Sequence, residues 1–144
     1  MVSHSPGGSV DGRYGPLAEA LASARGFVVF YPGDRGAFWR LRNPDVISYA
    51  VAGPGVAGQV TLSFDDPHGR RLSVISSRGE TRRTPPGEKP WNVGDEVVYL
   101  AAEGGEDVYA RIERAGSQAL VVVDQGYIAV DELITFATTL VPAS

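Results

Sequence analysis

The sequence contains no cysteine, a single lysine and two histidines, and these scarcities narrow what the chain can do. Without cysteine there is no disulfide, no thiolate zinc site and no cysteine nucleophile. Thirteen basic residues against 17 acidic ones give a formal charge of -4, so the chain lacks the overall basic field typical of proteins that bind nucleic acid. No apolar run approaches the ~18 residues that span a bilayer. The first ten residues have neither the basic n-region nor the apolar h-region of a signal peptide.

What is present is enough apolar side chain for one folded domain. The chain has 144 residues, of which 43% are apolar or aromatic. This length and composition suit a single domain and exclude a disordered chain, because there is enough surface to bury. Residues 1–13 are polar and rich in glycine, so we expect a disordered leader there. Residues 14–144 are predicted to form a single α+β domain.

Two helices and a run of strands are predicted by the hydrophobic periodicity. Residues 17–24 follow Pro16 and repeat apolar positions at helical spacing until Gly26. Residues 131–141 do the same and carry Asp131 and Glu132 in the first turn, where the helix dipole favours negative charge. About seven or eight strands are expected between them, at 27–31, 38–42, 46–51, 59–65, 71–77, 96–101, 108–113 and 119–123.

The fold class follows from the order of these elements. Residues 59–65 and 71–77 alternate strictly between apolar and polar side chains, which is typical of an antiparallel sheet with one buried face. The connections around Gly104-Gly105 and Ala115-Gly116 are short. We therefore predict an α+β fold: an antiparallel meander sheet of about seven or eight strands, with an N-terminal and a C-terminal helix packed on one face. The Pro-, Gly- and Arg-rich segment 77–90 is predicted to be a surface loop that opens easily.

No catalytic, cofactor-binding or metal-ligating residue is assigned, and no cofactor is predicted. The nearest to a chemical constellation is Asp65, Asp66 and His68, which could serve a metal ion or acid–base catalysis. The same residues suit a solvated hairpin turn, which we favour because no partner ligand with a recognisable spacing occurs elsewhere. The acidic groups Asp95-Glu96 and Glu103, Glu106-Asp107 flank turns, where carboxylates keep ordinary acidity.

Arginine and tryptophan provide the remaining candidates. Arg78, Arg82 and Arg83, with Arg70 and Arg71 nearby, are the only basic concentration. They could form an anion site, but a solvated loop balanced by Glu80 and Glu88 is favoured because no aromatic residues interleave with them. Trp39 and Trp91 could line a ligand pocket, and Trp39 is predicted to be a core residue instead.

Three stretches of the chain together carry a resemblance to known domains. They are the Ala-rich helix leading into Phe27-Val28-Val29-Phe30-Tyr31-Pro32 with Trp39-Arg40 after it, the strand pair at 60–64 and 72–76, and the ending 120–123 followed by 131–140. With these stretches the chain resembles a family of actinobacterial extracytoplasmic domains of unknown function. Related domains form the outer part of membrane-bound anti-sigma factors and small lipoproteins. The resemblance covers most of residues 15–141 and implies a non-enzymatic α+β domain outside the cytoplasmic membrane. It transfers no functional residue.

These observations favour a non-enzymatic binding or sensing domain that acts through a partner protein or a small apolar ligand. Two alternatives stay open: a small hydrolase or metal-assisted enzyme centred on Asp65, Asp66 and His68, and a structural homodimer built on an exposed sheet edge. No nucleic acid and no membrane span are expected. An extracytoplasmic location is expected if the chain is the soluble part of a longer protein, and a cytoplasmic one otherwise.

Overall fold

A computed structural model of the chain describes residues 12–15, 21, 26–32, 39–42, 47–53, 56–78, 88–101, 108–114 and 116–142. Its elements are β1 (Gly12–Gly15), β2 (Phe30–Pro32), β3 (Arg40–Leu41), β4 (Ile47–Gly53), β5 (Val56–Asp65), β6 (Arg71–Arg78), β7 (Lys89–Val93), β8 (Glu96–Ala101), β9 (Tyr109–Arg114), β10 (Ser117–Gln125), the helix α2 (Val130–Thr138) and β11 (Leu140–Pro142). The strand β1 begins at Gly12, at the end of the segment expected to be disordered, and pairs with β4. Residues 1–11 lie outside the described part.

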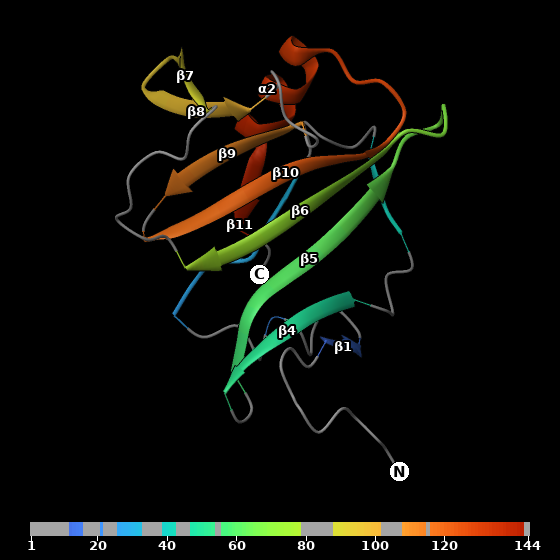
Figure 1. The fold of residues 1–144 in the computed structure, drawn as a ribbon, viewed down its shortest axis with the longest axis vertical. Coiled ribbons are helices and arrows are strands. Elements are labelled where there is room, and N and C mark those ends of the chain that lie inside the picture. Colours follow the sequence, from blue (N-terminus) through green and yellow to red (C-terminus); the bar gives the residue numbers. More distant parts are fainter. Residues whose placement is uncertain are drawn as a thin grey trace.

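Every strand pair is antiparallel, which confirms the predicted sheet type. Among the described residues, the main sheet has nine strands in the order β1-β4-β5-β6-β10-β9-β8-β7, with β3 beside β5 (Figure 1). The expectation of one continuous meander is therefore wrong at the centre, where β6 pairs with β10 instead of β7. Two meanders join there because their apolar faces continue each other, with Val74 opposite Val121 and Ser76 opposite Ala119.

One face of the main sheet carries the core. Alternate residues of each central strand point to it, as the period of two requires. The fully buried side chains include Val60 and Leu62 on β5, Leu72 and Val74 on β6, Val98 on β8, Ile112 on β9 and Val121 on β10. The helix α2 packs over β8 and β9 on this face through Leu133, Ile134, Phe136 and Ala137, and it lies behind the sheet in Figure 1.

The C-terminal helix is shorter than the periodicity predicted. It ends at Thr138, and residues 140–142 form β11 instead of a last helical turn. Thr138 and Thr139 each donate a side-chain hydrogen bond to a carbonyl three residues earlier, of Thr135 and Phe136. Such bonds compete with the helical ladder. The N-terminal helix lies outside the described residues except at Leu21, which is helical and packs against the core, so only one of the two predicted helices is described.

The segment predicted as the first strand does not join the main sheet. The strand β2 pairs with β11 to form a separate two-stranded sheet over the core. Two buried serines of the main sheet hold this segment in place: Ser76 Oγ accepts a hydrogen bond from Phe30 N (2.9 Å) and Ser117 Oγ accepts one from Val28 N (2.7 Å). Serine suits these positions because its hydroxyl satisfies backbone groups that would otherwise be buried without a partner.

The strand β7 was not predicted, because Pro90 within it argued for a loop. β7 is the edge strand of the main sheet, where a residue without an N–H is tolerated. All five of its residues are exposed, including Trp91 at 47%. The predicted loop 77–90 is therefore ordered as strand at both ends, in β6 up to Arg78 and in β7 from Lys89. Residues 79–87 lie outside the described part, so the expected easy opening stays a prediction.

Candidate functional site

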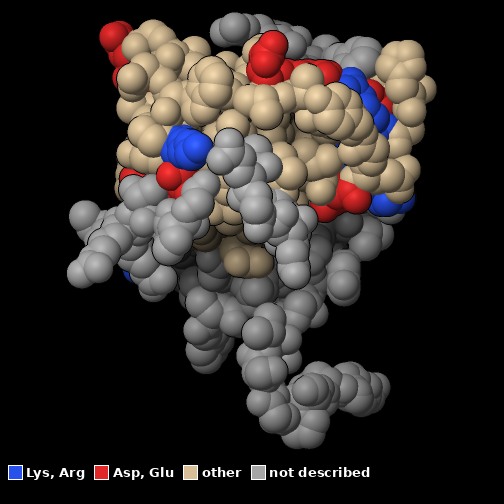
Figure 2. Space-filling model, turned by 45° about the horizontal axis from the view of Figure 1, so that its top comes forward, with Lys and Arg blue, Asp and Glu red and all other residues tan. Residues whose placement is uncertain are grey.

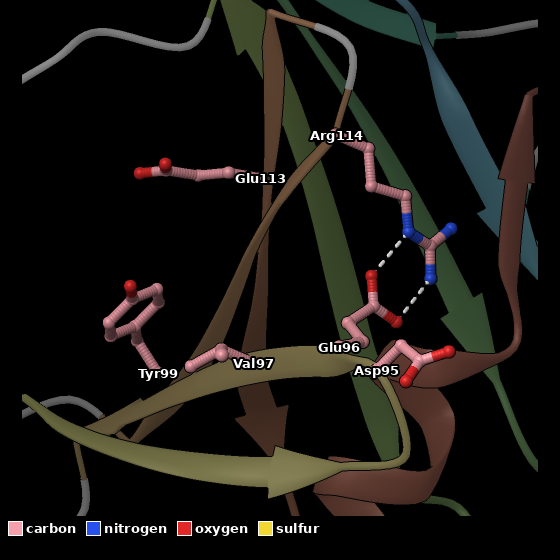
Figure 3. Close-up of a pocket in the computed structure, with 6 residues that line it drawn as sticks. All are labelled: Asp95, Glu96, Val97, Tyr99, Glu113 and Arg114. Atoms are coloured by element: carbon pink, nitrogen blue, oxygen red, sulfur yellow. Dashed lines mark hydrogen bonds and ion pairs between the residues drawn. The ribbon is translucent and has the colours of Figure 1, made fainter.

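The strands β8 and β9 separate before they end. They pair at Tyr99–Arg111, Leu100–Ala110 and Ala101–Tyr109, and within these two fully described strands there is no further pair. Both continue as strands for three more residues because each keeps its other neighbour, β7 for β8 and β10 for β9. We call the gap between residues 96–98 and residues 112–114 the wedge. Figure 3 shows β9 leaving β8 at a steep angle there.

A pocket of about 410 Å³ opens at the wedge. Its lining residues are Asp95, Glu96, Val97, Tyr99, Glu113 and Arg114. In Figure 3 the side chains of Val97, Tyr99 and Glu113 point to one side of the strands, and those of Asp95, Glu96 and Arg114 point to the other. The alternation of side chains along β8 and β9 explains this division for the five strand residues, since odd-numbered and even-numbered residues face opposite sides of the sheet. Asp95 lies in the turn before β8, outside this alternation.

On the core side, an ion pair spans the wedge. Arg114 Nε lies 2.5 Å from Glu96 Oε2 and Arg114 Nη2 lies 2.7 Å from Glu96 Oε1, a bidentate arrangement. Arg114 Nη1 donates to the carbonyl of Leu140 on β11, and the guanidinium lies 5.9 Å from the centre of the Phe30 ring. The hydrogen bonds that Arg114 donates to Glu96 outweigh the opposing effect of burial and raise the pKa of Arg114. These contacts hold the end of β9 to both β8 and the small sheet.

On the opposite side, a second ionic cluster centres on Glu88. Its side chain is only 1% exposed and accepts hydrogen bonds from Arg111 Nη2 (2.9 Å) and from Tyr109 Oη (2.5 Å). Burial and the bond to Glu88 raise the pKa of Tyr109 to about 12. Arg111 also pairs with Glu113 and lies 4.5 Å from the centre of the Tyr99 ring, a cation–π contact. Arg111 thus contacts both Tyr99 and Glu113 and holds these two side chains in position at the pocket lining.

Sequence reasoning missed this site for identifiable reasons. Glu88 was expected to be solvated, yet it is buried, because Arg111 and Tyr109 supply the partners that an ionised carboxylate needs away from water. Glu96 was considered only as a turn carboxylate. One signal was available: Glu96 lies five residues before Ala101 and Arg114 lies five after Tyr109, so a hairpin brings the opposite charges together. Glu103, Glu106 and Asp107 lie outside the described residues.

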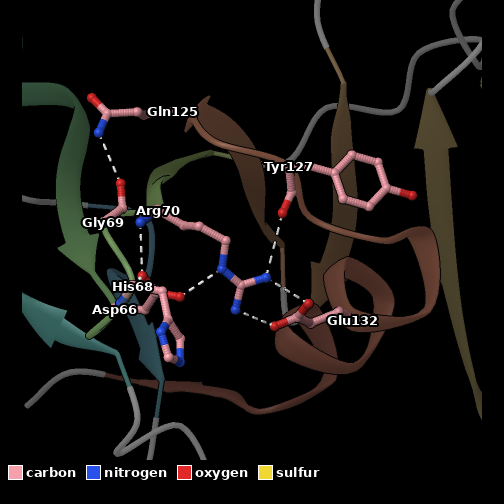
Figure 4. A network of polar contacts seen from close by, with 7 residues as sticks. All are labelled: Asp66, His68, Gly69, Arg70, Gln125, Tyr127 and Glu132. Carbon is pink, nitrogen blue, oxygen red and sulfur yellow. Dashed lines mark hydrogen bonds and ion pairs between the residues drawn. The ribbon is translucent and has the colours of Figure 1, made fainter.

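Asp66 and Arg70 form a closed network rather than an open cluster (Figure 4). The Asp66 carboxylate is inaccessible to solvent and accepts bonds from the backbone N–H groups of His68 (2.9 Å) and Arg70 (2.7 Å) and from Arg70 Nε (2.5 Å). Arg70 also holds Glu132 of α2 with two bonds of 2.7 Å. Burial opposes ionisation of Asp66, but these bonds outweigh it and lower its pKa.

The other candidate residues are distributed among separate contacts. Asp65 pairs with Arg42 (2.9 Å) and Arg71 (3.0 Å) instead of joining Asp66. Within the described part of the chain, no three His, Asp or Glu side chains are placed to hold a metal ion. Trp39 is a core residue as predicted, at 8% exposure.

Basic residues do not gather into one patch where they are described. Arg70 and Arg71 are occupied by ion pairs with acidic side chains, and Arg78 lies at the exposed end of β6. On the face shown in Figure 2, acidic and basic groups form small separate clusters among uncharged residues. Arg82 and Arg83 fall outside the described residues, so the anion-site alternative stays untested.

Comparison of the chain with protein-family models, with curated proteins and with solved structures finds no match. The resemblance to actinobacterial extracytoplasmic domains therefore remains a prediction. Among the described residues, no helix has the length and apolar character to cross a membrane.

Proposed function

We propose that this chain is a non-enzymatic binding domain and that the wedge between β8 and β9 is its binding site. The observation that carries the proposal is the early end of the β8–β9 pairing, which leaves a pocket of about 410 Å³ where a continuous sheet would have none. A pocket of this size falls in the range that small ligands and peptide side chains occupy.

The surroundings of the wedge support a rigid site. The Glu96–Arg114 pair braces one side, and the Glu88–Arg111–Glu113 cluster braces the other. Each strand is also held by its outer neighbour, so little conformational entropy remains to be lost when a ligand binds. By contrast, the Asp66 carboxylate is fully occupied by its own turn, which makes the wedge the better-supported site.

The lining favours a segment of a partner protein over an apolar small ligand. Four of the six lining side chains carry a formal charge at pH 7, namely Asp95, Glu96, Glu113 and Arg114, and only Val97 and the Tyr99 ring offer apolar surface. An apolar ligand would desolvate these charged groups without replacing their hydrogen bonds to water, which is costly. A peptide segment carries polar groups that can replace these hydrogen bonds.

Amide chemical-shift mapping of the ¹⁵N-labelled chain tests the proposal. The probes are acetylated tripeptide amides of sequence Ala-Xaa-Ala, with phenol and hexanol as apolar probes. At least one probe is expected to shift the amides of residues 96–98 and 112–114. Val97→Trp fills the pocket and should abolish these shifts, whereas Thr61→Trp, half-buried on β5, should preserve them. Shifts confined to other regions, or unaffected by Val97→Trp, would overturn the proposal.

A further inference from the structure

We infer that the ligand of the wedge is an extended, basic segment of a partner protein, which pairs through its main chain with the free strand edges and places an arginine or lysine side chain among the pocket carboxylates. This inference rests on the proposed function and adds the chemical class of the ligand.

The main-chain part of the inference comes from the strand edges. Residues 96–98 and 112–114 keep strand conformation, but the edges that face each other across the wedge are unpaired. Val98 and Ile112 are buried next to the last strand pair, so residues 96–97 and 113–114 form the accessible part of these edges. An unpaired strand edge presents N–H and C=O groups in the spacing of another strand. Extended peptides bind to such edges by adding a strand, with main-chain bonds giving affinity and side-chain pockets giving specificity. The two edges at the wedge are already held in position by the strands on their other sides, β7 beside β8 and β10 beside β9.

The basic part comes from the charges around the pocket. Asp95, Glu96, Glu113 and the buried Glu88 bring four carboxylates, against the two guanidinium groups of Arg111 and Arg114. Two formal negative charges are therefore left over.

Two of these carboxylates can be reached by a ligand. Asp95 is exposed in the turn between β7 and β8 and forms no ion pair with any other described residue. The Glu113 side chain pairs with Arg111 but remains 45% exposed, and it lines the pocket on the side of Tyr99. A cationic side chain entering the wedge would meet charge of opposite sign on both faces, while an acidic one would be repelled.

The same mapping experiment with matched peptides tests the inference. The probes are the acetylated pentapeptide amide Val-Thr-Arg-Thr-Val, the same peptide with neutral citrulline in place of arginine, and the arginine peptide with alternate backbone nitrogens methylated. The arginine peptide is expected to shift the wedge amides. The citrulline peptide should bind about tenfold more weakly because it loses charge-assisted hydrogen bonds, and the methylated peptide should bind more weakly still.

Chain variants supply the matched controls. Glu113→Gln and Asp95→Asn should each weaken the arginine peptide severalfold and leave the citrulline peptide unchanged. Asp131→Asn removes the same charge from the exposed first turn of α2, outside the pocket lining, and should have little effect.

Each contrary result overturns a defined part. Equal affinity of the citrulline peptide would overturn the basic requirement, and equal affinity of the methylated peptide would overturn strand pairing. If none of the pentapeptides shifts the wedge while phenol or hexanol does, the inference fails and the proposed function stands with a small ligand. If no probe shifts the wedge, both fail.

Discussion

Two arginine–carboxylate networks of similar chemistry lie at different places in the sheet and have opposite consequences. At the β5–β6 turn, Arg70 joins Asp66 to Glu132, and the two strands pair up to the last residue before the turn, Asp65 opposite Arg71. At the wedge, Arg114 joins Glu96 across strands that have stopped pairing. The first network closes a turn, and the second spans an opening.

An arginine–carboxylate pair stabilises the backbone arrangement around it, which is a closed turn at Arg70 and a gap between two strands at Arg114. The Asp66 carboxylate is buried and takes three hydrogen bonds from its own turn, so removing it leaves buried donors unpaired. The Glu96 and Arg114 side chains are 24% and 29% exposed, so water can replace either partner. We therefore expect the turn network to matter for stability and the wedge network to matter for binding.

The largest expected effect comes from the apolar layer under the closed network. Phe136 is buried, with its ring centre 5.7 Å from that of Trp39, whose ring lies beneath the Arg70 guanidinium. Phe136→Ala should lower the free energy of unfolding by about 3–5 kcal/mol, because it leaves a cavity. Thr138→Ala, on the other side of α2, should cost far less. Urea melts of both variants decide this, and equal small losses would show that α2 contributes little to the core.

Asp66→Asn is expected to have the next largest effect. It should lower the free energy of unfolding by about 3 kcal/mol, because it removes the charge from a buried, hydrogen-bonded pair. The lowered pKa sets the pH dependence. The folded chain releases this proton more readily than the unfolded chain, so the stabilisation is complete above pH 3.8 and is lost as the pH falls through the folded pKa. Thermal melts at pH 7 and at steps below pH 3.8 should therefore show a difference in stability between variant and wild type that narrows as the pH falls. A constant gap would contradict the argument.

Tyr109→Phe should cost about 2 kcal/mol by removing a hydrogen bond to the buried Glu88 carboxylate. Because the folded chain holds the Tyr109 proton more tightly, the contribution is complete below pH 10 and is lost as the pH rises through 12. Ultraviolet titration of phenolate formation should show that Tyr109→Phe removes one tyrosine that ionises about 2 pH units late. If the number of late-ionising tyrosines is the same in the variant and the wild type, the shift belongs to another tyrosine.

The smallest stability effect is expected at the wedge. Glu96→Gln breaks the bidentate pair, but both side chains are partly exposed, so the free energy of unfolding should fall by about 1 kcal/mol or less. Its effect should appear instead in peptide affinity and in faster amide exchange at residues 96–98 and 112–114. A loss as large as that of Asp66→Asn would erase the difference between the two networks.

Much of the framework could be predicted from local patterns. The alternation in residues 59–65 and 71–77 identified an antiparallel pair with one buried face. The helical spacing of apolar residues within 131–141 identified the face of α2 that packs, which includes Leu133, Phe136 and Ala137. Pro90 led to the prediction of a loop instead of β7. A strand tolerates proline when it lies at the edge of a sheet, and the position of β7 at the edge is a property of the tertiary structure. The end of α2 was misplaced because Leu140 continues the helical stripe, yet it pairs with Pro32 far away in the sequence.

The sequence by itself determined the sheet type, the buried face and the charges that a β8–β9 hairpin brings together, because these depend on side-chain period and on spacing along the chain. Only the tertiary structure decided that β6 pairs with β10, that Glu88 is buried and that β8 and β9 part above α2. Each of these outcomes depends on contacts between residues distant in sequence. The pairing of two strands continues only while the layer beneath and the neighbours beside them hold both in one plane, and no local pattern encodes that condition.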